Sequence, residues 1–327
     1  MDSSLQWSRR RSLAGGAALL AIAGIGPVGG AAIPVTAAIP SADGYANVPG
    51  GRIYWRRFGN GSKTPLLTLH GGPGAAHNYL LSMSALAEDR PVIFYDQLGC
   101  GKADAPADDA IYTIQRSVEE LDAVRKALRL DRVILYGHSW GTLLAIEYLC
   151  QKRGAGVEKL ILAGALPSVP QASAGMRRLI NSMPGDYARK LDMLETAGKM
   201  QTPEYAALVQ QFYDRFVLRV PPTPDALVSF DALAKSIAYR VLNGPNEFTI
   251  TGKIKDWDRR ADLGTITQPT LLTTGEFDEI TMDCHQTIQK GVAGRAKLVV
   301  MPGCSHLTMV EQPQQYNRIV RSFLEAA

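Results

Sequence analysis

Apolar runs separated by amphipathic segments dominate the chain from about residue 52 onward. Seven runs are short and apolar along most of their length, which is typical of strands buried on both faces. They read RIYWRRF, PLLTLH, PVIFYD, RVILYG, KLILAG, PTLLTT and AKLVVM. Between two of them, SVEELDAVRKALRL predicts a helix capped by Ser117, with Glu120 closing a capping box. This alternation indicates an α/β fold with a mostly parallel sheet and helices on both faces.

The pattern changes to helices without strands between the fifth and sixth runs. TPEYAALVQQFYDRFVLRV predicts a helix with Thr202 as the cap and Pro203 in the first turn, ending before Pro221. A second helix is predicted from Thr223 to Leu242. Both ends of the insertion return to the same sheet, so we expect a helical lid. The expected division is core at residues 45–166, lid at 167–263 and core again at 264–327.

The N-terminal segment has the three-part layout of an export signal: SRRRS, then an apolar run rich in Ala and Gly, then small residues ending in VTAA. Paired arginines before a weakly apolar core are typical of twin-arginine signals. A membrane anchor is disfavoured because four glycines and a proline interrupt the run, which falls short of roughly 20 strongly apolar residues. We therefore expect an export signal at residues 1–38, cleaved near Ala37 or Ala38. The twin-arginine machinery would be its partner, and the mature protein would be periplasmic or secreted, without membrane attachment.

Composition changes this picture little. The 327 residues, 46% hydrophobic and 20% charged, are enough for a sizeable globular core. The net charge is +4, but residues 1–40 hold three basic residues against one acid, so the remainder carries only +2. Nothing here indicates a nucleic-acid partner. The four cysteines match no zinc pattern, and we expect free, mostly buried thiols and no bound metal or cofactor.

A candidate nucleophile lies between the strand RVILYG and a following helix. Residues 137–141 read GHSWG, the G-x-S-x-G elbow, in which a sharp turn raises the serine side chain above the sheet. The five-residue pattern alone is weak evidence, but its position between a strand and a helix strengthens it. Ser139 is therefore the predicted nucleophile.

The base and the acid follow from their order in the chain. In elbow hydrolases the order is Ser, acid, His, and only His285 and His306 follow Ser139. His306 lies on a loop after the last strand, at the edge where open α/β sheets bind ligands. His285 lies in a polar, helix-like segment and is expected on the surface. In TTGEFDEIT, Asp278 is the predicted acid that orients His306.

The sequence also suggests roles for Glu276 and for the groups that would form an oxyanion hole. Glu276 in TTGEFDEIT is expected to be a solvated turn residue. An oxyanion hole needs two donors, and the N–H of Trp140, which follows the nucleophile, is one candidate. The HGGPG loop at 70–74 follows a core strand where such enzymes supply the second.

These segments together resemble the proline iminopeptidase family of α/β-hydrolases. The resemblance rests on LLTLHGGPG, VIFYDQLGCGKAD, YGHSWGT, YRVLNGPNEFTITGKIKDWD, GEFDE and GCSHLTMVEQP, and it runs from about residue 45 to the C-terminus. It implies an α/β-hydrolase fold with an inserted helical lid. It also implies a metal-free serine aminopeptidase or amidase that removes an N-terminal residue, often proline, or hydrolyses an amino-acid amide. Small peptides or amino-acid amides would be the substrates.

The resemblance also implies roles for individual residues. Ser139, Asp278 and His306 match the catalytic triad, and Gly72 and Trp140 match the oxyanion donors. Glu247 and Glu279 match the carboxylates that hold the free α-amino group, and Tyr239 matches a tyrosine that lines their pocket. Two departures are GCGKAD, where an Arg-Ser pair is commoner, and the His138 that precedes the nucleophile.

Two alternatives remain open from the sequence. An esterase or arylamidase acting on uncharged acyl groups would use the same triad. A hydrolase-fold binding protein without activity is a rival from another class, since a fold alone does not imply a function.

Overall fold

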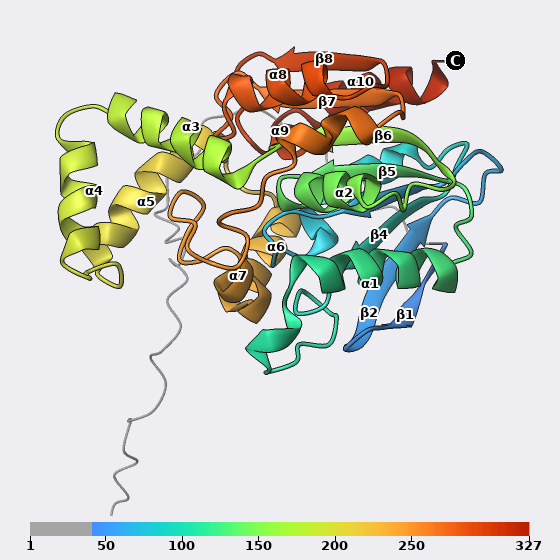
Figure 1. Cartoon of the computed structure of the whole chain (residues 1–327), viewed down its shortest axis with the longest axis horizontal. Coiled ribbons are helices and arrows are strands. Elements are labelled where there is room, and N and C mark those ends of the chain that lie inside the picture. The colour runs from blue at the N-terminus through green and yellow to red at the C-terminus, as the bar shows by residue number, and fades with distance from the viewer. Residues whose placement is uncertain (1–40, 327) are drawn as a thin grey trace, which may run out of the picture.

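The computed structural model describes residues 41–326, which form an eight-stranded sheet flanked by helices (Figure 1). The predicted export signal at residues 1–38 lies outside the described residues. The strands are β1 Ala42–Val48, β2 Gly51–Phe58, β3 Leu66–Leu69, β4 Val92–Asp96, β5 Val133–His138, β6 Val157–Ala163, β7 Thr270–Gly275 and β8 Ala296–Met301. Their order is β1-β2-β4-β3-β5-β6-β7-β8, and β3 to β8 run parallel. The seven predicted strands and the α/β class are confirmed.

The first strand, β1, was not predicted from the sequence. It pairs antiparallel with β2 along its whole length, from Ala42 opposite Arg57 to Val48 opposite Gly51. Only Ala46 of this strand is buried. An edge strand with one buried residue shows no apolar run, which is why the hydrophobic pattern missed it.

Two apolar clusters cover the two faces of the sheet. In β5, Val133 and Leu135 pack into one cluster, and the alternate residues Ile134 and Tyr136 pack into the other. Because both sides of these strands are buried, their sequences are apolar throughout. The covering elements are α1 Ile114–Ala127, α2 Trp140–Cys150, α8 Met282–Gly291, α9 Thr308–Glu311, α10 Pro313–Glu325 and the short 3-10 segments η1 His77–Leu86, η2 Asp109–Ile111 and η3 Arg260–Thr265.

Helix α1 forms as predicted, but its predicted cap is wrong. Thr113 caps the helix, and its hydroxyl accepts the N–H of Arg116. Ser117 lies one turn inside and donates to the Thr113 carbonyl, and Glu120 is buried, where it pairs with Arg116. A capping-box spacing also occurs inside helices, and here the earlier threonine supplies the cap.

Five helices lie between β6 and β7: α3 Val169–Ser182, α4 Tyr187–Thr196, α5 Pro203–Phe216, α6 Pro224–Lys235 and α7 Ile237–Leu242. Helices α3, α4 and α5 extend away from the sheet, whereas α6 packs on η1 (Figure 1). Thr202 caps α5 as predicted. The single helix predicted for residues 223–242 is divided at Ser236, whose hydroxyl accepts the N–H of Tyr239 and starts a new helix.

Two further observations concern the cysteines and the membrane. The four cysteines are free, as expected, and Cys100, Cys284 and Cys304 are buried while Cys150 is partly buried. None of the helices in the described range combines the length and apolarity that a membrane crossing demands.

Candidate active site

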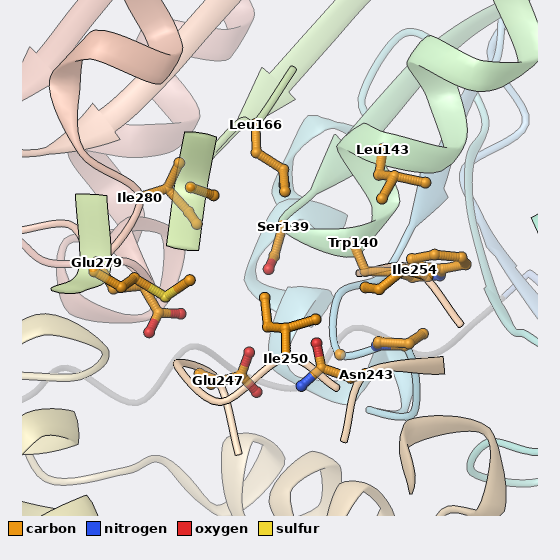
Figure 2. A pocket seen from close by; sticks show the side chains of 14 residues that line it. Ser139, Trp140, Leu143, Leu166, Asn243, Glu247, Ile250, Ile254, Glu279 and Ile280 are labelled. Carbon is orange, nitrogen blue, oxygen red and sulfur yellow. The ribbon is translucent and has the colours of Figure 1, made fainter. Parts of the chain in front are cut away.

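Ser139 lies at a strained turn between β5 and α2. Its backbone has φ +53° and ψ −120°, which L-residues rarely adopt outside constrained sites. Both glycines of the elbow are sterically required, because a Cβ on Gly137 would come within 2.4 Å of the Gly141 oxygen, and one on Gly141 within 2.0 Å of the Leu69 oxygen. The turn directs the Ser139 hydroxyl into a pocket (Figure 2).

Asp278 and His306 follow β7 and β8 and meet at the C-terminal edge of the sheet. His306 Nδ1 lies 2.7 Å from Asp278 Oδ1, and both side chains are buried. The carboxylate also accepts bonds from the Thr274 hydroxyl and the Ile280 N–H. Burial acts to raise the pKa of Asp278, but attraction to His306 outweighs it and lowers that pKa below its usual range. Asp278 is therefore a fixed anion that holds the imidazole.

The other ring nitrogen of His306, Nε2, lies 3.6 Å from Glu279 Oε1. Within residues 41–326 no hydrogen bond joins it to Ser139, although the His306 ring lies 4.6 Å, centroid to centroid, from the ring of His138, the residue before Ser139. Contacts of this kind often tighten only when substrate binds. Burial acts to lower the pKa of His306, but Asp278 and then the neighbouring glutamates raise it to about 9.

Two backbone N–H groups beside Ser139 have no acceptor among the described residues. They belong to Gly72 and Trp140, which line the same pocket as Ser139. The Gly72 loop packs directly on the elbow, since a Cβ on Gly71 would lie 3.1 Å from Ser139 Cβ. Free N–H groups beside a nucleophile are suited to binding an oxyanion.

Glu247 and Glu279 bring two carboxylates to the lid side of Ser139 (Figure 2). Glu279 is 2% exposed; its Oε1 lies 3.6 Å from His306 Nε2, and its Oε2 has no partner within the described chain. Glu247 is half-buried, and Tyr239 donates to its Oε1 at 2.8 Å. Burial raises the pKa of both glutamates, and repulsion from Glu247 and Asp278 raises that of Glu279 further. The pocket thus holds two carboxyl groups, one of them with an oxygen that has no partner among the described residues.

The lid contacts this edge of the sheet through its backbone. The carbonyl of Phe216, at the end of α5, accepts the N–H of Glu279 at 3.1 Å and the N–H of His306 at 3.2 Å. Leu307 N–H donates to the next carbonyl, that of Val217. One end of a lid helix therefore positions both loops that carry the predicted site residues.

The cavity between these groups is small. Its volume is about 30 Å³, room for one or two waters but not for an amino-acid residue. The lining residues are Gly72, Pro73, Ser139, Trp140, Leu143, Leu166, Ala172, Met176, Asn243, Glu247, Ile250, Ile254, Glu279 and Ile280. Most of them are apolar, and several come from the segment between β6 and β7.

The structure corrects one prediction and agrees with another. His285 is fully buried rather than at the surface, and its Nε2 accepts the N–H of Ala165 at 2.9 Å. Most residues of helix α8 are polar because one side of the helix is exposed, so its sequence does not indicate that His285 is buried. Glu276 is exposed and accepts the N–H of Gly303, as a turn residue would. No group of three or more His, Cys, Asp or Glu side chains in residues 41–326 is arranged to hold a metal.

Some supporting residues were missed in the sequence. Gln97 accepts from the Trp140 indole at 2.8 Å and donates to the carbonyl of His70, while its own N–H bonds the His70 ring. This links the HGGPG loop to the residue after the nucleophile. The available signal was a polar residue directly after the central strand PVIFYD, at the edge of the sheet that binds ligands.

Comparisons with known proteins agree with this geometry. The model of the alpha/beta hydrolase family matches residues 66–319. The proline iminopeptidase of Thermoplasma volcanium is 42% identical over 287 residues, which cover 86% of this chain and 96% of that protein. The proline iminopeptidase of Saccharolobus solfataricus is 39% identical, with 86% and 92% covered. The crystal structure of the Mycobacterium smegmatis proline iminopeptidase superposes with a TM-score of 0.80 at 33% identity, with 86% and 97% covered.

Proposed function

Because the chain belongs to the proline iminopeptidase family of α/β-hydrolases, we propose that it is a serine aminopeptidase. It would release an N-terminal L-amino acid, with proline favoured, from small peptides, or hydrolyse L-amino-acid amides. The chain covers 96% and 92% of the length of these two relatives, so the proposal draws on nearly all of each.

The observation that carries the proposal is the uncompensated carboxylate of Glu279. A buried carboxylate oxygen without a partner is costly unless a ligand supplies the missing donor. Glu247 adds a second carboxyl group to the same pocket. The α-ammonium group of a substrate offers three donors and a positive charge to both glutamates. An internal peptide bond has no such group, so these acids would select chain ends.

The proposed acylation step uses the residues around Ser139. With the substrate ammonium held by Glu247 and Glu279, the Ser139 oxygen attacks the carbonyl carbon of the N-terminal residue while His306 takes the hydroxyl proton. The N–H groups of Gly72 and Trp140 stabilise the negative oxygen.

Deacylation follows the same route with water. When the tetrahedral intermediate collapses, His306 protonates the leaving amine, and an aminoacyl ester of Ser139 remains. Water then attacks that ester, with His306 again the base, and the free amino acid leaves. Asp278 keeps the imidazole oriented and stabilises the imidazolium in both halves.

Two measurements test this function. A serine-directed phosphonate should label the wild-type enzyme at Ser139 and leave Ser139→Ala unlabelled, while that variant keeps its fold and loses turnover. The kcat/KM values for prolyl, alanyl and N-acetylprolyl anilides and for a short acyl ester should favour free amino groups by two orders of magnitude or more. Turnover by Ser139→Ala would end the mechanism, and preference for the N-acetylated or acyl substrates would indicate an esterase or arylamidase instead.

We also propose that residues 1–38 direct export by the twin-arginine machinery to the periplasm or the medium. The support is SRRRS followed by a Gly-rich apolar run and VTAA. Replacing Arg9, Arg10 and Arg11 by lysine should leave the precursor unprocessed in the cytoplasm, as shown by fractionation and intact mass. Unchanged processing and location in that variant would refute the proposal.

A further inference from the structure

Three buried hydrogen bonds run in series behind Ser139, from the HGGPG loop to His306. The N–H of Gly71 donates to Tyr79 Oη at 2.7 Å. The Tyr79 hydroxyl lies 2.8 Å from His138 Nδ1, and His138 Nε2 lies 3.1 Å from the carbonyl oxygen of His306. The Tyr79 and His138 side chains are only 4% and 2% exposed. The series therefore lies in the interior, shielded from water.

The hydrogen atoms in this series have one consistent arrangement. The Tyr79 oxygen already accepts an N–H, so its own proton goes to His138 Nδ1. His138 must then carry its proton on Nε2, and this N–H donates to the His306 carbonyl. Burial, with a further contribution from His306, lowers the pKa of His138 to about 3, so the ring stays neutral. Burial also raises the pKa of Tyr79, which keeps its proton.

The two ends of the series lie beside two groups of the proposed mechanism, an oxyanion donor and the base. Gly71 precedes Gly72, one of the proposed oxyanion donors, and the other end is the backbone of the proposed base, His306. The contacts along the series are close, because a Cβ on Gly71 would lie 3.0 Å from His138 Nδ1. A displaced ring at position 138 would therefore shift the oxyanion loop and the base loop relative to Ser139.

We propose that Tyr79 and His138 are positioning residues that fix the distance between the oxyanion loop and the base loop. The inference rests on the proposed serine mechanism and adds two residues that touch neither the substrate nor the reacting atoms. Oxyanion donors work over a window of only about 2.7–3.1 Å, and a displacement of about 1 Å can cost about 100-fold in rate. The pocket for the amino group is held by other residues, so loss of the series should lower kcat and leave KM nearly unchanged.

Tyr79→Phe tests this with the loss of one oxygen atom. It leaves the Gly71 N–H and His138 Nδ1 without a partner. We expect kcat for prolyl anilide to fall about 10- to 100-fold with KM within about twofold of wild type. An aminoalkyl boronate, whose tetrahedral adduct on Ser139 needs the oxyanion donors, should bind more weakly by a similar factor. The acid limb of kcat against pH should stay in place, because the Asp278–His306 pair is intact.

Two further variants complete the experiment. Tyr187→Phe is the matched control, because this tyrosine is 3% exposed and its hydroxyl donates to the Leu208 carbonyl at 2.7 Å, far out on the lid. It should lose thermal stability much as Tyr79→Phe does and keep kcat. His138→Leu removes both the acceptor for the Tyr79 hydroxyl and the donor for the His306 carbonyl, so it should lower kcat at least as far as Tyr79→Phe does. The double variant should lose no more than the worse single variant.

The outcomes separate this inference from the function on which it rests. A folded Tyr79→Phe or His138→Leu enzyme with kcat and boronate affinity within twofold of wild type would overturn the positioning role. So would equal loss of kcat in the Tyr187→Phe control. If Tyr79→Phe does not fold, His138→Leu decides the question, since it removes the same bond between positions 79 and 138. Failure of the phosphonate to label Ser139 in the wild type would instead overturn the serine mechanism and this inference with it.

Discussion

Replacing Glu279 by glutamine would remove one negative charge from the pocket at almost constant side-chain volume. The carboxylate is buried, with one oxygen 3.6 Å from His306 Nε2 and the other without a partner in the described residues. Burial and two neighbouring carboxylates raise its pKa, so ionising it in the empty pocket costs free energy. A substrate ammonium would supply the missing charge, and glutamine would not hold that ammonium as strongly.

The size of the effect follows from two opposing contributions. An ammonium about 4 Å from a carboxylate gains about 4 kcal/mol at an effective dielectric constant of about 20. Part of this is offset, because Glu279 must first lose its proton, at about 1.4 kcal/mol for each pKa unit above the working pH. Glu247 remains in the variant. We expect a net loss of about 2–3 kcal/mol in transition-state binding, or about a 30- to 150-fold lower kcat/KM for aminoacyl substrates.

The assay compares two substrates that differ in one feature of the acyl group. Prolyl 4-nitroanilide carries the ammonium in its five-membered ring, and 4-nitrophenyl cyclopentanecarboxylate has a ring of the same size with carbon in place of that nitrogen. The ratio of variant to wild-type kcat/KM is taken separately for each substrate, so the leaving groups need not match. Glu276→Gln is the control, because this exposed glutamate lies three residues earlier and, among residues 41–326, bonds only the N–H of Gly303. It should leave both ratios near one.

A selective loss on the prolyl substrate would support the reasoning. Equal loss of kcat/KM on both substrates would show that Glu279 acts on the chemistry of Ser139 or on folding rather than on the amino group. If kcat/KM of the Glu279→Gln variant for the prolyl substrate is within threefold of wild type, the Glu279 carboxylate does not bind the substrate ammonium. Thermal unfolding gives an independent check, since removing a buried, uncompensated carboxylate should raise the melting temperature.

Three further predictions follow. His306 must be neutral to act as a base, and its pKa is raised to about 9, so kcat/KM should fall as the pH drops below about 9. The value of kcat should persist to lower pH, because the ammonium of the bound substrate offsets the charge of the glutamates. If kcat and kcat/KM fall over the same pH range in pH–rate profiles, this prediction is wrong. Tyr239→Phe removes a hydrogen bond that lowers the pKa of Glu247, and it should raise KM for prolyl anilide about 5- to 10-fold with kcat little changed. Glu147→Gln weakens the bidentate ion pair between Glu147 on α2 and Arg259. It should lower the free energy of unfolding, measured by urea titration, by about 2 kcal/mol. An unchanged urea midpoint would show that this pair does not stabilise the fold.

The sequence predicts the parallel strands at the centre of the fold, because a strand that is buried on both faces has a sequence that is apolar throughout. Each parallel strand is an apolar run, and Ser139, Asp278 and His306 follow the ends of β5, β7 and β8 at one edge of the sheet. Asp278 and His306 meet there in the structure. The order of elements thus suffices to bring together residues that are far apart in the chain.

Features that depend on partners remote in sequence are not visible in this way. His285 lies in a helix that looks polar, yet it is buried against the backbone of Ala165. The bond from His138 to the carbonyl of His306 spans 168 residues, and nothing local to GHSWG marks it. The break at Ser236 was equally hidden, since the surrounding residues are good helix formers and only the serine's capping bond divides the segment.

The carbonyl of Phe216 has a consequence for protein engineering. Lids of α/β-hydrolases are attractive units for exchange between relatives, because they enter and leave the sheet at two points. Here one oxygen atom at the end of α5 accepts bonds from the peptides of both Glu279 and His306. A chimera that replaces this lid would also replace the backbone hydrogen bonds that position His306, the proposed base, and Glu279 of the proposed amino-group pocket. Successful grafts should therefore keep residues 216–217 of the recipient, at the end of α5, and change only other parts of the lid.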